Sequence, residues 1–127
     1  MSIATAGYTF AVLTMSDKGS RGERVDESGA YLLGRLAEEG YRQSAYALVP
    51  DRIADIVQQL RHFADDLKVS LVVTTGGTGL SPSDVTPEAM NEVLEREIPG
   101  MAEAMRAASM AKTNRAMLSR GRARTRR

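Results

Sequence analysis

Short apolar runs alternate with amphipathic segments through the first 75 residues, and this alternation restricts the fold more than any other feature of the sequence. Apolar runs of strand length lie at residues 8–14, 41–49 and 69–75. Between them, apolar residues recur at helical spacing over residues 26–40 and 51–67. Because parallel strands need crossover connections, which helices supply, the sequence predicts an α/β fold: a three-layer sandwich with helices on both faces of a mostly parallel sheet.

Residues with a capping preference mark the helix boundaries. Asp26 is a favourable N-cap for the first helical segment, and Gly40 is placed to end it. Asp51 stands in the same position before the second segment. A third helix is predicted after residue 85, with Thr86 as its N-cap and Pro87 in its first position.

The third apolar run leads directly into a glycine-rich loop, Gly76-Gly77-Thr78-Gly79. Glycines allow positive φ angles and close approach of a ligand, and successive backbone N–H groups can form an anion-binding concavity. Ligands of open parallel sheets bind beyond the carboxyl ends of the strands, where this loop is expected to lie. The loop is therefore a candidate phosphate site. The alternative is an ordinary tight exit from a strand.

Two aspartates lie in loops that the predicted topology brings to the same edge of the sheet. Asp84 follows the glycine loop, and Asp51 precedes the second helix. A carboxylate beside a bound phosphate would repel it unless a cation such as Mg²⁺ bridges the two, and Mg²⁺ prefers oxygen ligands. Asp84 could therefore bind such a metal, and Asp51 could orient the same ion or a nucleophile. On spacing alone, capping of the helix is favoured over catalysis for Asp51, and initiation of a turn is as well supported as metal binding for Asp84.

The composition is that of one globular domain of 127 residues without cysteine. Disulfides and thiolate metal sites are thereby excluded, and a reducing cytoplasm is the expected location. No apolar run approaches the roughly 20 residues needed to cross a bilayer, so we expect no membrane partner. His62 is the only histidine and is expected on a helix surface rather than in a zinc site. The seven methionines are expected to fill the core.

Arginine is concentrated at the C-terminal end of the sequence. Five arginines fall within residues 120–127. Such a cluster could bind nucleic acid electrostatically, but no aromatic residue lies among the arginines to stack on bases. A solvated tail is therefore favoured over a nucleic-acid partner. We divide the chain into a single domain, residues 1–119, and an arginine-rich tail, residues 120–127.

Several motifs over residues 8–120 together resemble the molybdopterin adenylyltransferases of the MoaB/Mog family, whose fold also occurs in gephyrin-like proteins. In chain order these motifs are Thr14-Met15-Ser16-Asp17, Val49-Pro50-Asp51, Thr74-Thr75-Gly76-Gly77-Thr78-Gly79, Asp84-Val85-Thr86-Pro87-Glu88, Ile98-Pro99-Gly100-Met101, Met105-Arg106 and Met117-Leu118-Ser119-Arg120. An ordered series of this kind is far more specific than a glycine loop alone.

The resemblance implies transfer of an adenylyl group from Mg-ATP to molybdopterin, with release of pyrophosphate, in molybdenum cofactor biosynthesis. It implies that Asp51 and Asp84 are the catalytic, metal-binding residues. The residues implied to bind nucleotide or pterin substrate are Ser16, Asp17, Thr75, Gly76, Gly77, Thr78, Gly79 and Ser119. It also implies a cytoplasmic homotrimer, or a hexamer of stacked trimers.

The resemblance further implies another strand and a Pro-Gly-containing substrate loop after Ser119, where this sequence has the arginine-rich residues 121–127. We therefore expect a family member that is shortened at the C-terminus. This departure leaves an alternative open, in which a non-catalytic protein of the same fold binds molybdopterin or nucleotide without turnover.

Overall fold

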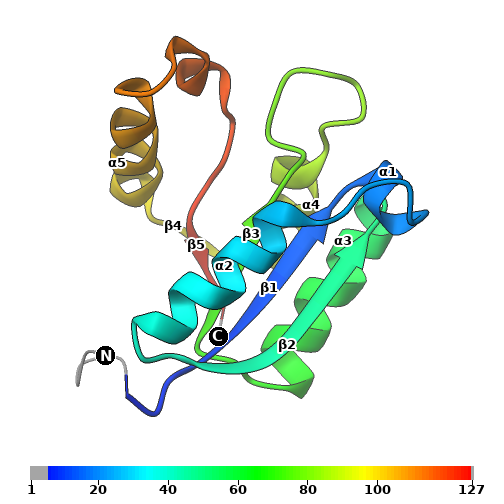
Figure 1. Cartoon of the computed structure of the whole chain (residues 1–127), viewed down its shortest axis with the longest axis vertical. Helices are drawn as coiled ribbons and strands as arrows, with labels where there is room; N and C mark the ends of the chain where they lie inside the picture. The colour runs from blue at the N-terminus through cyan, green and yellow to red at the C-terminus, as the bar shows by residue number, and fades with distance from the viewer. Residues whose placement is uncertain (1–5, 127) are drawn as a thin grey trace.

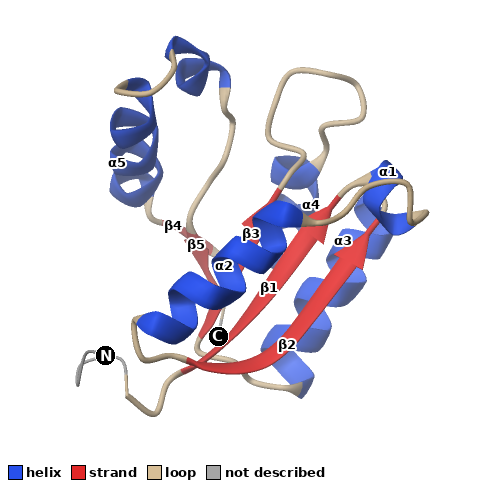
Figure 2. Ribbon diagram, viewed as in Figure 1, coloured by secondary structure: helices blue, strands red, loops and turns tan. Residues whose placement is uncertain are grey.

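A three-stranded parallel sheet forms the centre of the computed structural model, which describes residues 6–126 (Figures 1 and 2). The strand order is β2-β1-β3, with β1 (Thr9–Met15) between β2 (Arg42–Val49) and β3 (Leu71–Thr75). Both neighbours run parallel to β1. All three strands lie within two residues of the predicted positions.

Helices cover both faces of this sheet, as the sequence predicted (Figure 2). α2 (Glu27–Glu38) packs on one face, and α3 (Ile53–Arg61) and α4 (Thr86–Val93) pack on the other. Side chains of a strand alternate between the two faces. One face of β1 therefore presents Ala11, Leu13 and Met15 to a core that α3 and α4 complete with Ile56, Val57, Leu60, Ala89, Met90 and Val93.

The first helix begins and ends as its sequence indicates. The Asp26 carboxylate accepts a hydrogen bond from the Gly29 N–H at 3.0 Å, which makes it the N-cap of α2. Gly40 follows the helix with a φ of +98°, a conformation that favours glycine. The second predicted helix continues beyond α3 as a π-helical turn, η2 (His62–Asp66), whose Phe63 side chain is only 2% exposed. His62 lies on the surface as expected and contacts Asp66.

The other two predicted caps are wrong. Arg52 occupies the N-cap position of α3 and Val85 that of α4, and neither makes a side-chain capping bond. The helix α4 already includes Thr86, whose hydroxyl donates to the Gly76 carbonyl at 2.8 Å. The Asp51 carboxylate accepts a hydrogen bond from the Asp17 N–H instead. Both side chains have tertiary partners that displace the local capping bond.

The C-terminal part of the chain forms a second, smaller unit beside the sandwich (Figure 1). Its elements are β4 (Arg96–Glu97), α5 (Pro99–Met110), the 3-10 helix η3 (Asn114–Leu118) and β5 (Arg124–Thr125), and β4 pairs with β5 in antiparallel orientation. The expectation of a solvated tail is therefore wrong for residues 120–126, whereas the domain division at residue 119 stays a prediction. Residue 127 lies outside the described residues.

The expectation of methionines in the core is correct for only two of those that the structure describes. Met15 and Met90 are buried. The other four described methionines are exposed and belong to the C-terminal unit: Met101, Met105, Met110 and Met117. Met1 lies outside the described residues. Among residues 6–126, none of the helices has the length and apolar character needed to cross a membrane.

Candidate active site

Loops that follow the three strands of the main sheet meet at its carboxyl edge. The segment after β1 contains Ser16 and Asp17, the segment after β2 contains Asp51, and the glycine loop follows β3. This juxtaposition was expected from the parallel topology. It brings together most of the predicted site residues, whose roles stay predictions.

Asp17 and Asp51 hold each other through a reciprocal pair of hydrogen bonds. The Asp17 N–H donates to Asp51 Oδ2 at 3.1 Å, and the Asp51 N–H donates to Asp17 Oδ1 at 2.9 Å. Asp17 is also the first residue of α1 (Asp17–Ser20), which Ser16 caps by accepting a hydrogen bond from the Gly19 N–H at 3.0 Å. The backbone of one loop thus fixes the carboxylate of the other. No sequence pattern signalled this pairing.

The surroundings of Asp51 favour a bound cation. Partial burial raises the pKa of the Asp51 carboxyl, the hydrogen bond from the Asp17 N–H acts in the opposite direction, and the negative charges of Asp17 and Asp84 raise the pKa further. The net shift is upward. A cation at this point would stabilise the ionised form that burial and the other two acids disfavour.

Two residues of the glycine loop require glycine for steric reasons. Gly76 and Gly77 have φ angles of +100° and +71°. A Cβ atom on Gly76 would lie 2.3 Å from the Met15 carbonyl oxygen, and one on Gly77 would lie 2.3 Å from Thr86 Oγ1. Each of these contacts is far shorter than van der Waals separation. The loop therefore depends on its glycines at both positions.

The glycine loop leaves backbone donors free. Thr86 closes its base, because the Thr86 N–H donates to the Gly77 carbonyl at 3.1 Å and its hydroxyl donates to the Gly76 carbonyl. Among the hydrogen bonds of residues 6–126, none uses the backbone N–H groups of residues 77–80. Four successive N–H groups without an acceptor in this part of the chain are suited to bind the oxygens of a phosphate.

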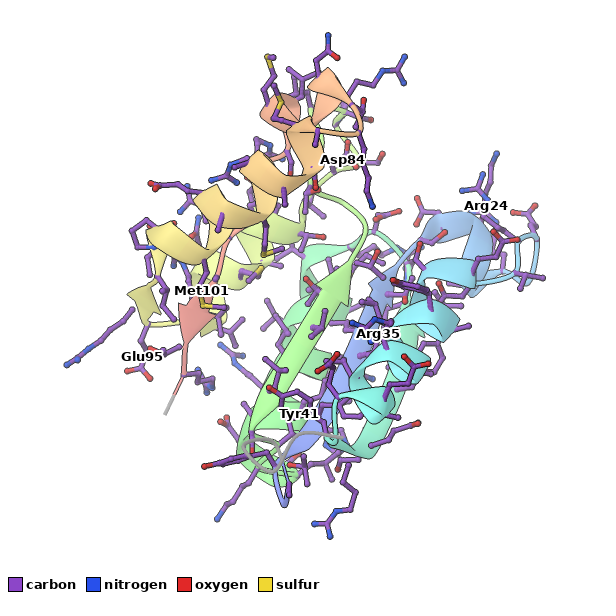
Figure 3. All side chains as sticks on the ribbon, turned by 60° about the vertical axis from the view of Figure 1, so that its left-hand side comes forward. Arg24, Arg35, Tyr41, Asp84, Glu95 and Met101 are labelled. Atoms are coloured by element: carbon purple, nitrogen blue, oxygen red, sulfur yellow. The ribbon has the colours of Figure 1, made fainter. Side chains whose placement is uncertain are left out.

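Asp84 lies at the far end of the same loop. The Ser81 N–H donates to Asp84 Oδ2 at 3.0 Å, and the Asp84 N–H donates to the Ser81 carbonyl at 2.9 Å, so Asp84 does close a turn. Asp84 Oδ1 takes no hydrogen bond from any described residue. Figure 3 shows Asp84 and Arg24 toward the same end of the molecule. The turn that Asp84 closes therefore leaves room for the predicted metal-binding function of its carboxylate.

The carboxylates present suit Mg²⁺ only if a substrate completes the coordination. No cluster of three or more acidic or histidine side chains within residues 6–126 could hold a metal ion alone. Mg²⁺ commonly binds one or two carboxylates together with water and substrate phosphates. Asp51 and Asp84 beside the free N–H groups of the loop match that donor set.

A cleft of about 560 Å³ opens beside the site, between the end of β1 and the start of α2. Three predicted residues line it: Ser16, Thr75 and Gly76. Arg24 and Asp26 also line this cleft, although nothing in the local sequence marked them as binding residues. Arg24 adds a positive charge to a cleft that Asp26 and Glu27 also line.

Ser119 reaches the glycine loop from the C-terminal unit. Its hydroxyl donates to Thr78 Oγ1 at 3.4 Å and accepts from the Gly121 N–H at 3.2 Å. Arg106 supports the same segment by donating to the Gly121 carbonyl at 2.7 Å. Ser119 and Arg106 also line a small cavity of about 110 Å³ between α5 and η3. The structure thus connects the predicted serine with the loop.

The sequence of residues 11–126 matches a family described as a probable molybdopterin binding domain. The molybdenum cofactor synthesis protein cinnamon of Drosophila melanogaster is 40% identical over 114 residues, which are 89% of this chain and 19% of that protein. The molybdopterin adenylyltransferase of Helicobacter pylori strain J99 is 38% identical over 111 residues, covering 86% of this chain and 63% of that enzyme. The chain thus spans less than two thirds of the length of these relatives.

A solved structure shares the fold closely. The molybdopterin biosynthesis enzyme MoaB of Thermus thermophilus superposes with a TM-score of 0.82 at 47% sequence identity, and the match covers 94% of this chain and 75% of that one. The fold class predicted from the sequence is therefore confirmed by the observed sheet topology and by the similarity to this solved structure. The match over residues 11–126, together with relatives named for molybdenum cofactor biosynthesis, shows that the chain belongs to the family of probable molybdopterin binding domains.

Proposed function

We propose that this domain transfers the adenylyl group of ATP to molybdopterin and releases pyrophosphate. The observation that carries the proposal is the row of free N–H groups at residues 77–80, flanked by the carboxylates of Asp51 and Asp84. A phosphate-binding loop between two acids suits phosphoryl chemistry with a metal-bound nucleotide. The adenylyltransferase name of the Helicobacter pylori relative supports the same reaction.

The reaction requires alignment and charge compensation more than covalent catalysis. An oxygen of the acceptor attacks the α-phosphorus of ATP, and the bond from that phosphorus to the leaving pyrophosphate breaks. The loop N–H groups would hold phosphate oxygens in line for this displacement. Ser119, beside Thr78, would contact the pterin substrate at the edge of the loop.

Asp51 and Asp84 would hold Mg²⁺, with water and nucleotide phosphates as its remaining ligands. When bound, the ion supplies positive charge that offsets the charge of the phosphates. Asp17 would keep the Asp51 carboxylate in place through the two reciprocal hydrogen bonds. Thr86 would keep the loop closed at its base, so that its N–H groups face the ligand.

We propose a homotrimer, or a hexamer of stacked trimers, in the cytoplasm as the form that carries out this reaction. Exposed apolar side chains of the C-terminal unit support association: Met101, Met105, Met117 and Leu118. Contact with another copy would remove this apolar surface from water. Multi-angle light scattering of the purified chain measures the assembly directly.

The test is mass-spectrometric detection of adenylylated molybdopterin after incubation of the chain with molybdopterin and Mg-ATP. We expect Asp84→Asn to fold normally and to lose at least about 100-fold in turnover, because a metal-binding charge is removed at nearly constant shape. Asp66→Asn is the matched control, since Asp66 is an exposed acid that contacts His62 on η2. It should retain the turnover of the parent chain.

Each outcome of this test has a defined meaning. Full activity of Asp84→Asn would contradict the assignment of Asp84 as a metal ligand. A folded parent chain that binds ATP in calorimetry but forms no product would contradict the transfer reaction. That result would instead support the non-catalytic binding alternative.

A further inference from the structure

Arg120 makes more contacts with the glycine loop than any predicted site residue does. Its Nε–H donates to the Gly79 carbonyl at 2.9 Å, and its Nη2 donates to the Asp84 carbonyl at 2.7 Å. Its backbone N–H donates to the Thr78 carbonyl at 2.8 Å. Figure 1 shows the segment that follows η3 passing beside this loop. Three points of the loop are thus tied to one residue.

The same guanidinium group joins the loop to α4. Arg120 Nη1 donates to Glu88 Oε2 at 2.6 Å, and Nη2 donates to Glu88 Oε1 at 3.3 Å, so the ion pair is bidentate. The hydrogen bond from Arg120 lowers the pKa of the Glu88 carboxyl, and the paired carboxylate raises the pKa of the Arg120 guanidinium. Glu88 lies in the first turn of α4, whose position the buried core fixes. Arg120 therefore connects the glycine loop to a helix whose position the core fixes.

The direction of these bonds matters for the loop. Arg120 takes the carbonyl oxygens of Thr78 and Gly79 through its backbone N–H and its Nε–H, just as Thr86 takes those of Gly76 and Gly77. Because the two sides of a peptide unit point in opposite directions, carbonyls held toward Arg120 leave the N–H groups of the loop turned away from it. Those N–H groups are the free donors of the candidate phosphate site.

Direct binding of a phosphate by Arg120 is disfavoured by the same contacts. A guanidinium group has five N–H donors in a fixed planar arrangement. All three of its nitrogen atoms already donate to protein acceptors, and all of these acceptors lie on the loop or on α4. Four of the five N–H groups are used in this way, so a bidentate contact with phosphate would have to break at least one of these bonds.

We propose that Arg120 is a positioning residue, which holds the glycine loop in the conformation that presents its N–H groups to phosphate. The expected effect of Arg120 on catalysis depends on the proposed function, whereas its expected effect on the loop does not. The structural consequence, a loop that opens without Arg120, can be measured without any substrate. The shape of the guanidinium group matters here as well as its charge, because a lysine ammonium cannot bridge two carbonyls and a carboxylate in one plane.

The first experiment is amide hydrogen exchange on Arg120→Ala, Arg120→Lys and the parent chain. We expect exchange of the hydrogen-bonded amides of Ser81, Asp84 and Thr86 to become at least about tenfold faster in both variants, while exchange of β1 stays unchanged. Arg122→Gln is the matched control, because Arg122 contacts Asn91 and Glu97 rather than the loop. If Arg120→Ala proves too unstable to measure, Glu88→Gln removes the ion pair and should accelerate exchange of the same residues.

The second experiment separates positioning from direct binding. In calorimetry with Mg-ATP, Arg120→Ala should bind at least about tenfold more weakly than Arg122→Gln. Glu88→Gln should weaken binding in proportion to its faster loop exchange, although it leaves the arginine in place. Normal loop exchange in Arg120→Ala combined with lost binding would overturn the proposal in favour of direct phosphate contact.

Unchanged loop exchange in both Arg120→Ala and Glu88→Gln would also overturn the proposal. A parent chain that shows the expected exchange differences but neither binds ATP nor forms product would contradict the proposed function while supporting the positioning by Arg120. The two hypotheses therefore fail in different measurements.

Discussion

The βαβαβ region, residues 9–75, and the C-terminal region, residues 94–126, are stabilised by different interactions. The first buries apolar side chains between the sheet and its helices. The second buries only Ala102 and Ala116 and exposes four methionines. Arginines of this region instead donate to carbonyl oxygens within the region and outside it: Arg106 to Ser119 and Gly121, Arg120 to Gly79 and Asp84, and Arg126 to Val93. Apolar burial fixes the scaffold, and polar contacts place the segment that reaches the loop.

The comparison predicts a large difference between matched truncations in the two regions. Phe63→Ala should lower the free energy of unfolding by about 3–5 kcal/mol, because the side chain is almost fully buried and its removal leaves a cavity. Met105→Ala should change it by less than about 0.5 kcal/mol, because that side chain is 64% exposed. Urea unfolding of the two variants measures both values. Similar losses would show that α5 is packed in solution, for example against another copy.

A medium effect is expected at a polar contact inside the βαβαβ region. Tyr46 on β2 donates a hydrogen bond to the Asp26 carboxylate at the start of α2. Tyr46→Phe should lower the free energy of unfolding at neutral pH by about 1 kcal/mol, the usual net contribution of such a bond. A value near zero would show that apolar burial alone holds α2 on the sheet.

The same variant has a signature in its pH dependence. Burial, followed by the hydrogen bond to Asp26, raises the pKa of Tyr46 from 10.0 to about 12. A pKa raised by folding means that the contribution to stability is complete below pH 10 and is lost as the pH rises toward 12. The parent chain should lose stability over this range, and Tyr46→Phe should lose less. Parallel curves for the two proteins would contradict the assignment.

Asp26 should give a matching signature in acid. Burial alone would raise the pKa of Asp26, but the hydrogen bonds from Tyr46 and the Gly29 N–H, together with the nearby Thr14 hydroxyl, lower it overall from 3.8. The corresponding stability is present above pH 3.8 and is lost as the pH falls through the lower, folded-state pKa. Tyr46→Phe should reduce this acid-side loss as well.

The smallest effect is expected at the ion pair that connects the two regions. Arg126 donates to the Asp65 carboxylate at 2.7 Å, and both side chains are partly exposed. Arg126→Gln should lower the free energy of unfolding by less than about 0.5 kcal/mol, because exposed ion pairs contribute little. Amide exchange in β5 should nevertheless become faster. In the parent chain, raising the salt concentration should have the same local effect. A loss above about 2 kcal/mol would mean that the C-terminal region stabilises the whole fold.

Prediction from the sequence succeeded where the interactions are local and periodic. The strand ends differ by at most two residues from those expected, and Asp26 caps its helix as predicted. It failed for the caps Asp51 and Thr86, because partners distant in sequence compete for both side chains. Local capping preference carries no information about such partners.

The candidate site was predicted in part. Asp51, Asp84 and the glycine loop follow strands or precede helices, so the sequence places them at one edge of the sheet. The reciprocal bonds of Asp17 and Asp51 and the contacts of Arg120 join segments more than 30 residues apart. In the sequence, Arg120 is only the first of five arginines in residues 120–127, and nothing near it indicates a contact with the glycine loop.

The sequence by itself determined the layers of this protein, because apolar periodicity decides which side chains must be buried and hence which segments become strands and helices. Only the tertiary structure decided where its charged side chains point. A long polar side chain selects its partner from all groups within reach, and those groups come from loops that only the folded sheet brings together. Arg120 shows the difference, since its ordinary arginine character is in the sequence and its function as an anchor of the glycine loop comes from the fold.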